Sequence, residues 1–355
     1  TRPIIHKKFN ARNIVIDEKG LPKWPSEITQ IAYNWKLLIK TVKLIHKKRP
    51  SLIYHRTTGF SFIGVLISIC CRIPLIIEIN SSETWKCKNW GHIRFSSLLE
   101  LTEKLCTLYA HKIAVISDEV KNFLINIDVP SEKIIVNPNG VDPKFFAPGG
   151  NGKTHKTVKK YGLTNKTVVG FVGSFNRYHG ILTLARAIKL VIQKNRNIHF
   201  MVIGDGKLKS DFEEVINSTN VSRFVTLTGK ITHETVPVLL DVCDILVSPH
   251  QNMVDGSTFF GSPTKIFEYM SMGKGIVASN VGQLGKILQH EKTALLIHPE
   301  DPTGLADGIV RLSADTDLRQ SLGKNARKHV KKLYTWEKNA ERVIKPDSGK
   351  KEQKD

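Results

Sequence analysis

The segment GSPTKIFEYMSMGKGIVAS, residues 261–279, decides the fold of the second half of the chain. Ser262 is a good N-cap and Pro263 suits the first helical position, so a helix is predicted to begin there. Gly273 predicts the end of that helix, and the apolar run GIVAS is typical of a buried strand. A short helix followed directly by a buried strand is typical of an α/β fold with a parallel sheet.

The same segment predicts a binding site. A helix N-terminus offers unpaired N–H groups and a positive dipole end, which makes Ser262, Thr264 and Lys265 candidates for a phosphate cradle. An ordinary helix cap is the alternative. Glu268 lies about one and a half turns further on, among apolar neighbours. A buried carboxylate is costly unless it accepts hydrogen bonds, so Glu268 either caps nearby backbone or holds the hydroxyls of a ligand.

The bulk composition narrows the range of partners. The chain has 355 residues, which favours two domains, and its 53 Lys and Arg against 32 Asp and Glu give a net charge of +21. Such a charge favours a nucleotide or phospholipid headgroups as partner. Nucleic acid is not expected, because there is no arginine-rich run, zinc-finger spacing or aromatic-basic repeat. The five cysteines form no C-x-x-C pair and predict reduced thiols in a cytosolic protein.

Short apolar runs alternate with helical patterns along most of the chain. Strands are expected at 51–56, 74–80, 112–117, 133–140, 167–174, 198–206, 224–229, 244–249, 275–279 and 294–297. The Gly-, Lys- and Pro-rich segment 143–166 is interpreted as a linker. The resulting prediction is a Rossmann-like domain over 1–150, a second over 165–330, and a C-terminal helix with a disordered basic tail over 331–355.

In parallel sheets ligands bind beyond the carboxyl ends of the strands. In the second half these ends carry GSFNRYHG, GDGK and TGKI, which brings Gly173, Ser174, Arg177, His179 and Ile231 to one predicted crevice. Beyond the strand at 275–279, Gly282 and Gln283 are candidates for backbone contacts to a ligand, with a plain turn as the alternative.

The first half carries its own candidates at strand ends. Arg56, Glu78 and Asn80 follow or close two predicted strands, where an acceptor site is expected. A partly buried salt bridge and strand-end turns are the alternatives for these residues. Among all candidates, the residues expected to act in catalysis are His179, Arg56 and Glu78.

One helix has a strongly basic face. Lys36, Lys40, Lys43 and Lys47 recur at helical spacing, while the opposite face carries Trp35, Leu38, Ile39, Val42 and Ile45. The helix either packs on a sheet with a solvated basic face or rests on anionic lipid. The apolar window 60–79 is divided by Arg72 and Pro74 into a core helix and a core strand, which is too short for a membrane span.

Several motifs together resemble the retaining glycosyltransferases of family 4, which have the GT-B architecture of two Rossmann-like domains. These motifs are SPTKIFEYMSMGKGIVASNVGQLGKIL, GFVGSFNRYHGILTLARAI, NPNGVD, CDILVSP and LLIHPEDPTGLADGI. The resemblance implies a nucleoside-diphosphate sugar on the C-terminal domain, an acceptor on the N-terminal domain, and retention of the anomeric configuration. It also implies that Glu268 holds the ribose diol.

The chain departs from the family pattern at three places. The first of two family glutamates would fall at Phe260, so Asp255 is a candidate for contact with sugar hydroxyls, with a solvated loop as the alternative. Ser174 and His179 stand near the positions of a family Arg and Lys that face the diphosphate, and Arg177 is expected to supply the missing charge. No glycine-rich turn precedes the strand at 51–56, which predicts a truncated start or a reduced acceptor domain.

The expected function is therefore transfer of a sugar from a nucleoside-diphosphate sugar to a glycan or lipid-linked acceptor, in the synthesis of cell-surface polysaccharide or glycolipid. No metal and no cofactor are expected, and the D-x-D sequence at Asp315–Asp317 is interpreted as a loop and helix N-cap. The protein is expected in the cytoplasm, peripherally on the inner face of the membrane. A nucleotide-sugar epimerase of similar fold and a non-catalytic partner subunit are the alternatives.

Overall fold

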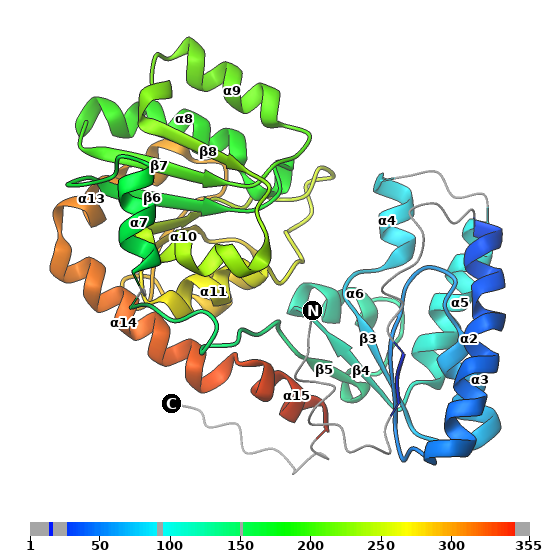
Figure 1. The fold of residues 1–355 in the computed structure, drawn as a ribbon. Helices are drawn as coiled ribbons and strands as arrows, with labels where there is room; N and C mark the ends of the chain where they lie inside the picture. Colours follow the sequence, from blue (N-terminus) through cyan, green and yellow to red (C-terminus); the bar gives the residue numbers. More distant parts are fainter. Residues whose placement is uncertain (1–13, 17–26, 91–94, 150–151, 345–355) are drawn as a thin grey trace. The chain divides into compact units, whose positions relative to one another are not determined.

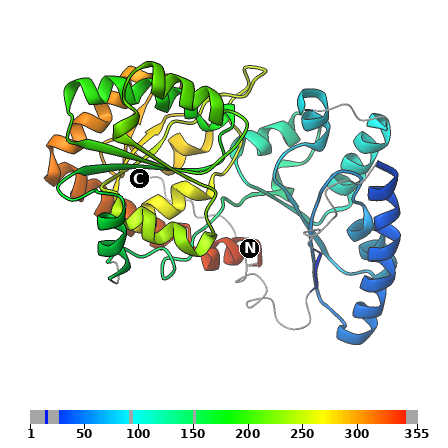
Figure 2. The same cartoon turned by 45° about the horizontal axis from the view of Figure 1, so that its top comes forward.

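The structure is a computed structural model, and it describes residues 14–16, 27–90, 95–149 and 152–344. The chain forms two compact units (Figures 1 and 2). The first contains residues up to Pro138 and those from Trp336 onward, and the second contains Asn139–Thr335. Each unit is built around one parallel sheet, and the predicted α/β class is confirmed.

The first unit has a five-stranded sheet in the order β1-β2-β3-β4-β5, with every neighbouring pair parallel. Its strands are β1 (Ile14–Ile16), β2 (Ile53–Arg56), β3 (Leu75–Ile79), β4 (Lys112–Val115) and β5 (Ile134–Val136). Its helices are α2 (Glu27–Lys48), α3 (Ile63–Cys71), α4 (Glu83–Trp90), α5 (Ser96–Tyr109), α6 (Asp118–Ile125), η1 (Ser131–Lys133) and α15 (Trp336–Ile344). The four strands expected in this half are confirmed.

Helix α15 belongs to the first unit although it lies at the end of the described chain. Its Ala340 and Val343 are buried against Tyr54, Ile76 and Ala114 of the sheet. The expected tail beyond residue 344 lies outside the described residues. The core helix and core strand expected in the window 60–79 are α3 and β3, and this prediction is confirmed.

The second unit has a six-stranded parallel sheet in the order β11-β10-β9-β6-β7-β8. Its strands are β6 (Thr167–Val172), β7 (Ile198–Ile203), β8 (Val225–Gly229), β9 (Ile245–Ser248), β10 (Gly275–Ser279) and β11 (Leu295–Ile297). Its helices are α7 (Lys153–Lys160), η2 (Arg177–His179), α8 (Ile181–Lys194), α9 (Lys209–Ser218), η3 (Ser222–Phe224), η4 (His233–Thr235), α10 (Val236–Val242), α11 (Thr264–Met272), α12 (Gly282–Ile287), α13 (Pro302–Ala314) and α14 (Thr316–Leu333).

The segment after Pro138 joins the second unit earlier than the linker at 143–166 implied. Asn139 donates its backbone N–H to the Ser262 hydroxyl, and its side-chain amide donates to the Ser262 carbonyl. Val141 donates its N–H to the carbonyl of Tyr334 at 3.0 Å. These bonds fix residues 139–141 on the second unit, because a backbone that is buried there must satisfy its polar groups.

The core of the second unit holds its sheet rigidly. Buried side chains of β6, β7, β9 and β10 pack against α8 and α13, and helix α11 is buried over most of its length. Strand β10 is buried at all its positions, and Gly273 ends α11 in the left-handed conformation at φ 64°. The predictions of a buried helix, a glycine stop and a buried strand in 261–279 are thus confirmed.

Candidate functional site

The strand order places a topological switch point between β6 and β9. From β6 the sheet continues to β7 and β8 on one side, and β9, β10 and β11 fill the other side. Ligands bind at such a point in open α/β sheets, beyond the carboxyl ends of the strands. The loops after β6 and β9 touch there. Gly180 has φ 67°, and an added Cβ would lie 1.6 Å from the carbonyl oxygen of Pro249, so only glycine fits.

Helix α11 brings a buried ammonium to this point. Lys265 is only 6% exposed, and its Nζ has no hydrogen-bond partner. The Nζ lies 4.5 Å from the ring centre of Phe171 on β6, and a Cβ added to Gly173 would be 2.6 Å from it. Burial lowers the pKa of Lys265 to about 7, an effect that Glu268 opposes. A buried cation without hydrogen bonds is costly, and an anion bound beside it would offset that cost.

The start of helix α11 differs from the prediction. The helix begins at Thr264, Pro263 occupies the N-cap position, and neither Ser262 nor Pro263 caps it through a side chain. The Ser262 hydroxyl instead accepts from the N–H of Asn139 at 3.0 Å. The N-cap assigned to Ser262 is therefore wrong, because the segment 139–141 recruits its oxygen. The exposed Thr264 and the buried Lys265 now form the first turn.

Glu268 lies in the next turn of the same helix, half-buried. Burial raises the pKa of its carboxyl to about 7, and the nearby Lys265 opposes this rise. In the part of the chain that the structure describes, no donor hydrogen-bonds to this carboxylate. Glu268 is therefore not the buried cap that the sequence left open. Its oxygens are available for hydroxyl groups of a ligand.

His179 ends the loop after β6, and its tautomer follows from its contacts. Its Nδ1 lies 2.7 Å from the carbonyl oxygen of Ser174, which can only accept, so Nδ1 carries the proton. Burial and the charge of Lys265 lower the pKa of His179 to about 3. The ring is therefore neutral, and its Nε2 is an acceptor. A neutral His179 facing the diphosphate, as the resemblance implies, would have to donate to a phosphate oxygen, but its one N–H already binds Ser174.

His250 is a site residue that the sequence analysis missed. It follows β9, and its Nδ1 lies 2.9 Å from the Ser248 hydroxyl while its buried Nε2 has no hydrogen-bond partner. The ring lies 5.1 Å from His179 and 4.9 Å from Phe259, centre to centre. Burial, then Lys265 and His179, lower the pKa of His250 well below its usual value. A histidine directly beyond the run CDILVSP was the signal that could have found it.

The remaining candidates on the loops after β6 and β8 differ in their exposure and in how close they lie to Lys265. Ser174 is exposed and accepts from the Asn176 amide at 3.1 Å, and Arg177 is exposed as well. Gly173 forms the wall against Lys265. Ile231 is half-buried beyond β8, and the structure gives it no contact with the cluster.

The candidates beyond β9 and β10 lie on two further loops. Asp255 is exposed, and its Oδ1 accepts from the N–H and the hydroxyl of Ser257, which is a local turn. Gly282, at φ 49°, begins α12, and an added Cβ would lie 2.0 Å from the Phe259 carbonyl oxygen. Gln283 follows it and is buried. The loop after β9 and the start of α12 therefore meet at Phe259.

Metal ligands do not gather in any described part of the molecule. Among the residues outside the undescribed segments, no three His, Cys, Asp or Glu side chains form a group that could hold an ion. Asp315 caps α14 by accepting from the N–H of Leu318 at 2.8 Å, and Asp317 lies in its first turn. The N-cap interpretation of the D-x-D sequence is confirmed.

The candidates of the first unit form one paired cluster at the ends of β2 and β3. Arg56 Nε lies 3.8 Å from Glu78 Oε1, and the hydroxyl of Tyr54 donates to Glu78 Oε2 at 2.5 Å. With its amide turned to satisfy both neighbours, Asn80 accepts from Arg56 at 2.7 and 2.9 Å and donates to Glu78 at 3.1 Å. These three residues therefore lie together, as their places at neighbouring strand ends predicted. The salt bridge named as their alternative is present.

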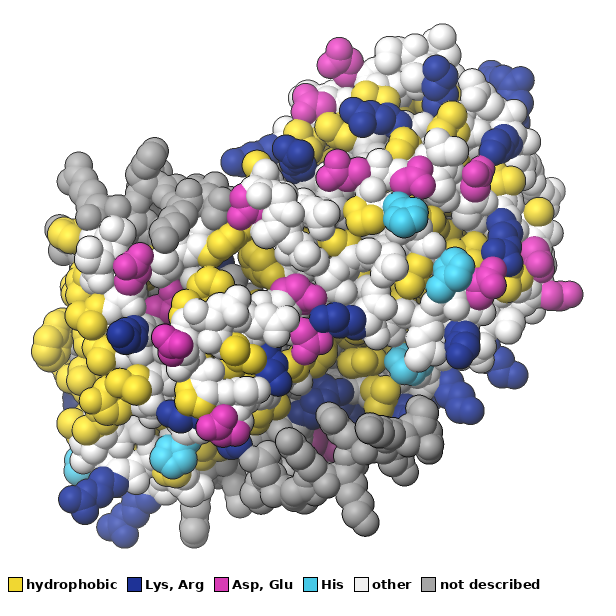
Figure 3. Space-filling view, turned by 180° about the vertical axis from the view of Figure 1, so that it is seen from behind, with side chains coloured by type: hydrophobic (Ala, Val, Ile, Leu, Met, Phe, Trp, Pro, Cys, Tyr) yellow, Lys and Arg dark blue, Asp and Glu magenta, His cyan; other side chains and the backbone are white. Residues whose placement is uncertain are grey.

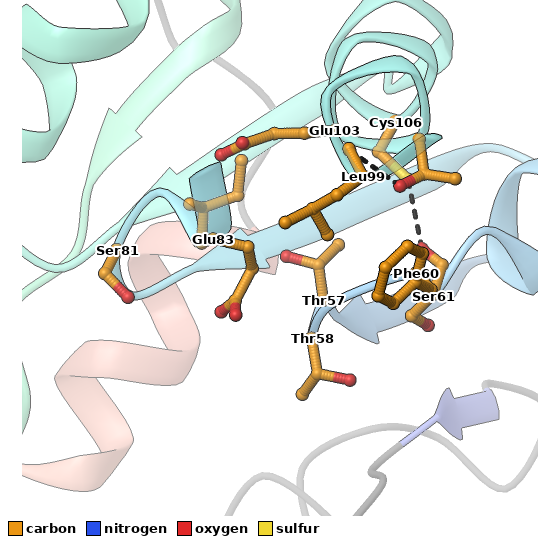
Figure 4. Close-up of a pocket in the computed structure, with 11 residues that line it drawn as sticks. Thr57, Thr58, Phe60, Ser61, Ser81, Glu83, Leu99, Glu103 and Cys106 are labelled. Atoms are coloured by element: carbon orange, nitrogen blue, oxygen red, sulfur yellow. Dashed lines mark hydrogen bonds between the residues drawn. The ribbon is translucent and has the colours of Figure 1, made fainter. Parts of the chain in front are cut away.

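A small pocket with a cavity volume of about 20 Å³ opens to solvent beside these strand ends (Figure 4). Its lining is mostly hydroxyl groups, two carboxylates and apolar side chains, and it contains no Lys or Arg. The lining residues are Thr57, Thr58, Phe60, Ser61, Ile79, Ser81, Glu83, Leu99, Thr102, Glu103 and Cys106. Sequence reasoning did not find this pocket, because its residues come from separated segments that share no motif.

Family models match both units. Residues 9–145 match the model described as Glycosyltransferase Family 4, and residues 166–315 match the one described as Glycosyl transferases group 1. The chain belongs to glycosyltransferase family 4. It is an enzyme of the glycosyltransferase class, as the motifs at 262–288 and 170–188 predicted.

Curated relatives and solved structures agree with this assignment. The capsular polysaccharide biosynthesis glycosyltransferase CapM of Staphylococcus aureus is 24% identical over 93% of this chain and 88% of its own length. An Escherichia coli galactosyltransferase, named for UDP-Gal and α-D-GlcNAc-diphosphoundecaprenol, is 24% identical over 87% of this chain and 78% of its own length. The structure of Anabaena HepE with UDP superposes with a TM-score of 0.72 at 20% identity, covering 87% of this chain and 80% of that chain. The predicted GT-B fold is confirmed.

Proposed function

We propose that this family 4 glycosyltransferase moves a sugar, with retention of configuration, from a nucleoside-diphosphate sugar to a glycan or lipid-linked acceptor in cell-surface polysaccharide or glycolipid synthesis. One observation carries the donor part of this proposal. The buried Lys265 ammonium has no partner at the switch point of the second sheet, and Glu268 is open one turn further along the same helix. A diphosphate and a ribose diol, joined in one molecule, match this spacing of a cation and a carboxylate.

The roles of the donor-site residues follow from their surroundings. Lys265 and the free N–H groups at the start of α11 bind the diphosphate and stabilise the charge that grows on it as the sugar leaves. Gly173 lets the diphosphate approach the loop after β6, and the exposed Arg177 and Ser174 contact it from the solvent side. Gly282 and Gln283 line the end of the site at the start of α12. A fixed cation at the diphosphate makes a divalent metal unnecessary.

The two histidines have a different task in this proposal. His179 presents an Nε2 that accepts a hydrogen bond, and the ring of His250 lies 5.1 Å away. A sugar hydroxyl is the donor that this nitrogen fits, so we assign His179 to a hydroxyl of the transferred sugar instead of to phosphate. We assign His250 to hold His179 and Phe259 in place, with its Nε2 bound to a water or a second hydroxyl.

The acceptor part of the proposal is supported by the pocket beside β2 and β3. The hydroxyl groups of the pocket suit a neutral sugar. Its two carboxylates are already bound, since Glu83 pairs with Lys86 at 2.6 Å and Glu103 accepts from the Thr84 hydroxyl at 2.6 Å. Arg56, Glu78 and Asn80 would shape one side of the acceptor site. CapM and the E. coli galactosyltransferase are named for polysaccharide synthesis and for a lipid-diphosphate acceptor, which supports the same acceptor class.

The place of the enzyme in the cell is part of the same proposal. Among the described cysteines, Cys70, Cys71, Cys106 and Cys243 are free thiols, which suits a reducing cytoplasm. In the ranges that the structure covers, no helix is long and apolar enough to cross a bilayer. A lipid-linked acceptor would therefore be met at the inner face of the membrane.

The test is a panel of nucleotides and nucleotide sugars against the purified chain. A ligand at 100 times its dissociation constant should stabilise the folded protein by about 2.7 kcal/mol, which thermal unfolding detects. The best ligand is then tested for slow hydrolysis and for transfer to simple glycan acceptors, with NMR of the product for its anomeric configuration. Inversion would exclude the retaining mechanism. Epimerised donor without transfer would exclude the transferase. Activity that EDTA abolishes and only magnesium or manganese restores would exclude metal independence.

A further inference from the structure

Three helices of the first unit expose large apolar side chains on their outer faces. Of the sixteen large hydrophobic side chains that are exposed in the described chain, nine lie on α2, α3 and α5. They are Trp35, Ile39, Leu44, Leu66, Ile69, Leu98, Leu101, Leu108 and Tyr109. Helix α3 packs against both α2 and α5, so these side chains belong to one continuous face, which we call the α2/α3/α5 face. Yellow side chains gather along the left edge of Figure 3, where this unit is seen.

On helix α2, large apolar side chains are exposed to solvent instead of packing on the sheet. If the helix packed on the sheet through its apolar face, Trp35 and Ile39 would be buried, but they are 61% and 60% exposed. Asn34 and Thr41 occupy the buried stripe instead. The packed alternative is therefore wrong for these two residues. An exposed apolar surface of several helices in one unit is typical of an interaction site.

The same face is basic. Lys36, Lys40, Lys43 and Lys47 are exposed along α2, as predicted. Lys104 is exposed on α5, and Arg72 is exposed directly after α3. Among the described side chains of these three helices, Glu100 is the one exposed acid. A partner of this face must therefore offer both apolar and anionic groups.

We infer that the α2/α3/α5 face docks on the surface of an anionic phospholipid bilayer. Leucine, isoleucine and tryptophan side chains enter the boundary of the acyl chains, while the lysines stay at the level of the phosphates. A second copy of the chain fits less well, because two such basic faces would repel one another. Nucleic acid would satisfy the lysines but leave the leucines of α5 in water.

The inner sides of the same helices hold the loop of the pocket described above. The Asn34 amide donates to the carbonyl of Phe60 at 3.0 Å and accepts from the N–H of Phe62 at 3.3 Å. The thiol of Cys106 on α5 donates to the carbonyl of Ser61 at 3.2 Å (Figure 4). Docking through these helices would thus keep the pocket loop close to the lipid surface. This last step rests on the proposed function, whereas the docking itself does not.

The experiment is co-sedimentation of the full chain with vesicles of phosphatidylcholine alone or with added phosphatidylglycerol. Binding should require phosphatidylglycerol and fall sharply from low to high salt. Lys36→Gln combined with Lys40→Gln should lower the partition coefficient about 25-fold, at about fivefold for each lysine. Ile69→Ser and Leu108→Ser should each lower it about tenfold. Lys189→Gln on α8 and Val254→Ser, both exposed in the second unit, are matched controls that should bind as the parent does.

Equal sedimentation with neutral and anionic vesicles would overturn the inference, and so would face variants that bind as the controls do. A dimer in solution that Leu108→Ser dissociates would assign the face to a second copy. Hydrolysis of a soluble nucleotide sugar should be the same in every variant, since none of these residues lies in the donor site. Loss of vesicle binding with intact hydrolysis therefore separates this inference from the proposed function.

Discussion

Charged side chains lie at the carboxyl ends of the parallel strands in both units, but only those of the first unit satisfy one another's hydrogen bonds. In the first unit Arg56, Glu78 and Asn80 satisfy one another, and the hydroxyl of Tyr54 completes the set. In the second unit the Lys265 ammonium and the Glu268 carboxylate stand close together without hydrogen bonds from the described chain. A self-satisfied cluster holds its loops in place without a ligand. An unsatisfied pair is held in place by the surrounding core, and in our proposal a ligand supplies its partners.

The largest effect is expected when the unpaired cation is removed. Lys265→Met should lower kcat by a factor of about 10²–10³, because one preorganised donor at the leaving group is lost. The free protein should become more stable by about 1–3 kcal/mol, since an unsatisfied buried group disappears. The pKa of Lys265 is lowered to about 7 from 10.5, so the penalty is full below about pH 7 and fades as the pH rises toward 10.5. The stability gain should therefore be larger at pH 6 than at pH 9.

Lys274 is the matched control for Lys265. It follows the same helix, but its Nζ donates to the Asp241 carbonyl at 2.7 Å and pairs with the Asp241 carboxylate at 3.6 Å. Lys274→Met should unfold at lower temperature and keep its donor affinity. Turnover and thermal unfolding of the two variants measure the difference. If both variants lost stability and kept turnover, Lys265 would be an ordinary structural residue.

The carboxylate of the pair gives the next largest effect. Glu268→Ala should lower nucleoside-diphosphate affinity at least about hundredfold, because two hydroxyl bonds to a charged group of about 1.5–3 kcal/mol each are lost. Glu268→Gln keeps one acceptor oxygen and should lose part of that. The free protein should stay folded, since this carboxylate holds no described backbone group. Calorimetry measures the affinities, with Glu214→Ala on α9 as the exposed control. Normal nucleotide affinity together with a lower unfolding temperature would show that Glu268 has a structural role.

The sequence predicted the features that depend on neighbouring residues and missed those that depend on distant ones. Local signals in 261–279 were sufficient for the helix, its glycine stop and the buried strand, since each depends on neighbouring residues. They were insufficient for Ser262, because its partner Asn139 is distant in sequence, and for His250, because its neighbour His179 lies on another loop. The tautomer of His179 depends on a carbonyl placed by the loop. Trp35 and Ile39 show that helical periodicity cannot tell an apolar face that packs inward from one that remains exposed.

The paired cluster of the first unit should respond in the opposite sense. Glu78→Gln removes the charge that Arg56, Asn80 and the Tyr54 hydroxyl share, and it should lower the free energy of unfolding by about 1–3 kcal/mol. Nucleoside-diphosphate affinity should not change, since the donor lies in the second unit in our proposal. Thermal unfolding and calorimetry on the same sample separate the two quantities. A variant with unchanged stability but weaker nucleotide binding would remove the distinction between the two clusters.

The pH dependence of nucleotide affinity tests whether Lys265 and Glu268 both contact the nucleotide. The pKa of Lys265 and that of Glu268 are both about 7, and binding needs the ammonium protonated and the carboxylate ionised. Affinity should therefore peak near neutral pH and fall by up to about tenfold per pH unit on either side. Lys265→Met should abolish the alkaline limb, and Glu268→Gln the acid limb. His179 and His250 stay neutral over this range, since the pKa of each is lowered. A flat profile between pH 6 and 9 would show that neither residue contacts the nucleotide.

The smallest effect is expected at His179, and it distinguishes the sugar from the phosphate. Its Nδ1–H binds the Ser174 carbonyl at 2.7 Å, so its Nε2 accepts one neutral hydrogen bond. His179→Ala should lower kcat/KM for the nucleotide sugar by about 2- to 12-fold, the equivalent of about 0.5–1.5 kcal/mol. Affinity for the nucleoside diphosphate without sugar should be unchanged. A set of deoxy-sugar donors should contain one that the parent enzyme uses as poorly as His179→Ala uses the complete donor, and the variant should lose nothing further with it. If His179→Ala instead weakened the nucleoside diphosphate and the nucleotide sugar equally, the histidine would contact phosphate, and the tautomer deduced from Ser174 would be wrong.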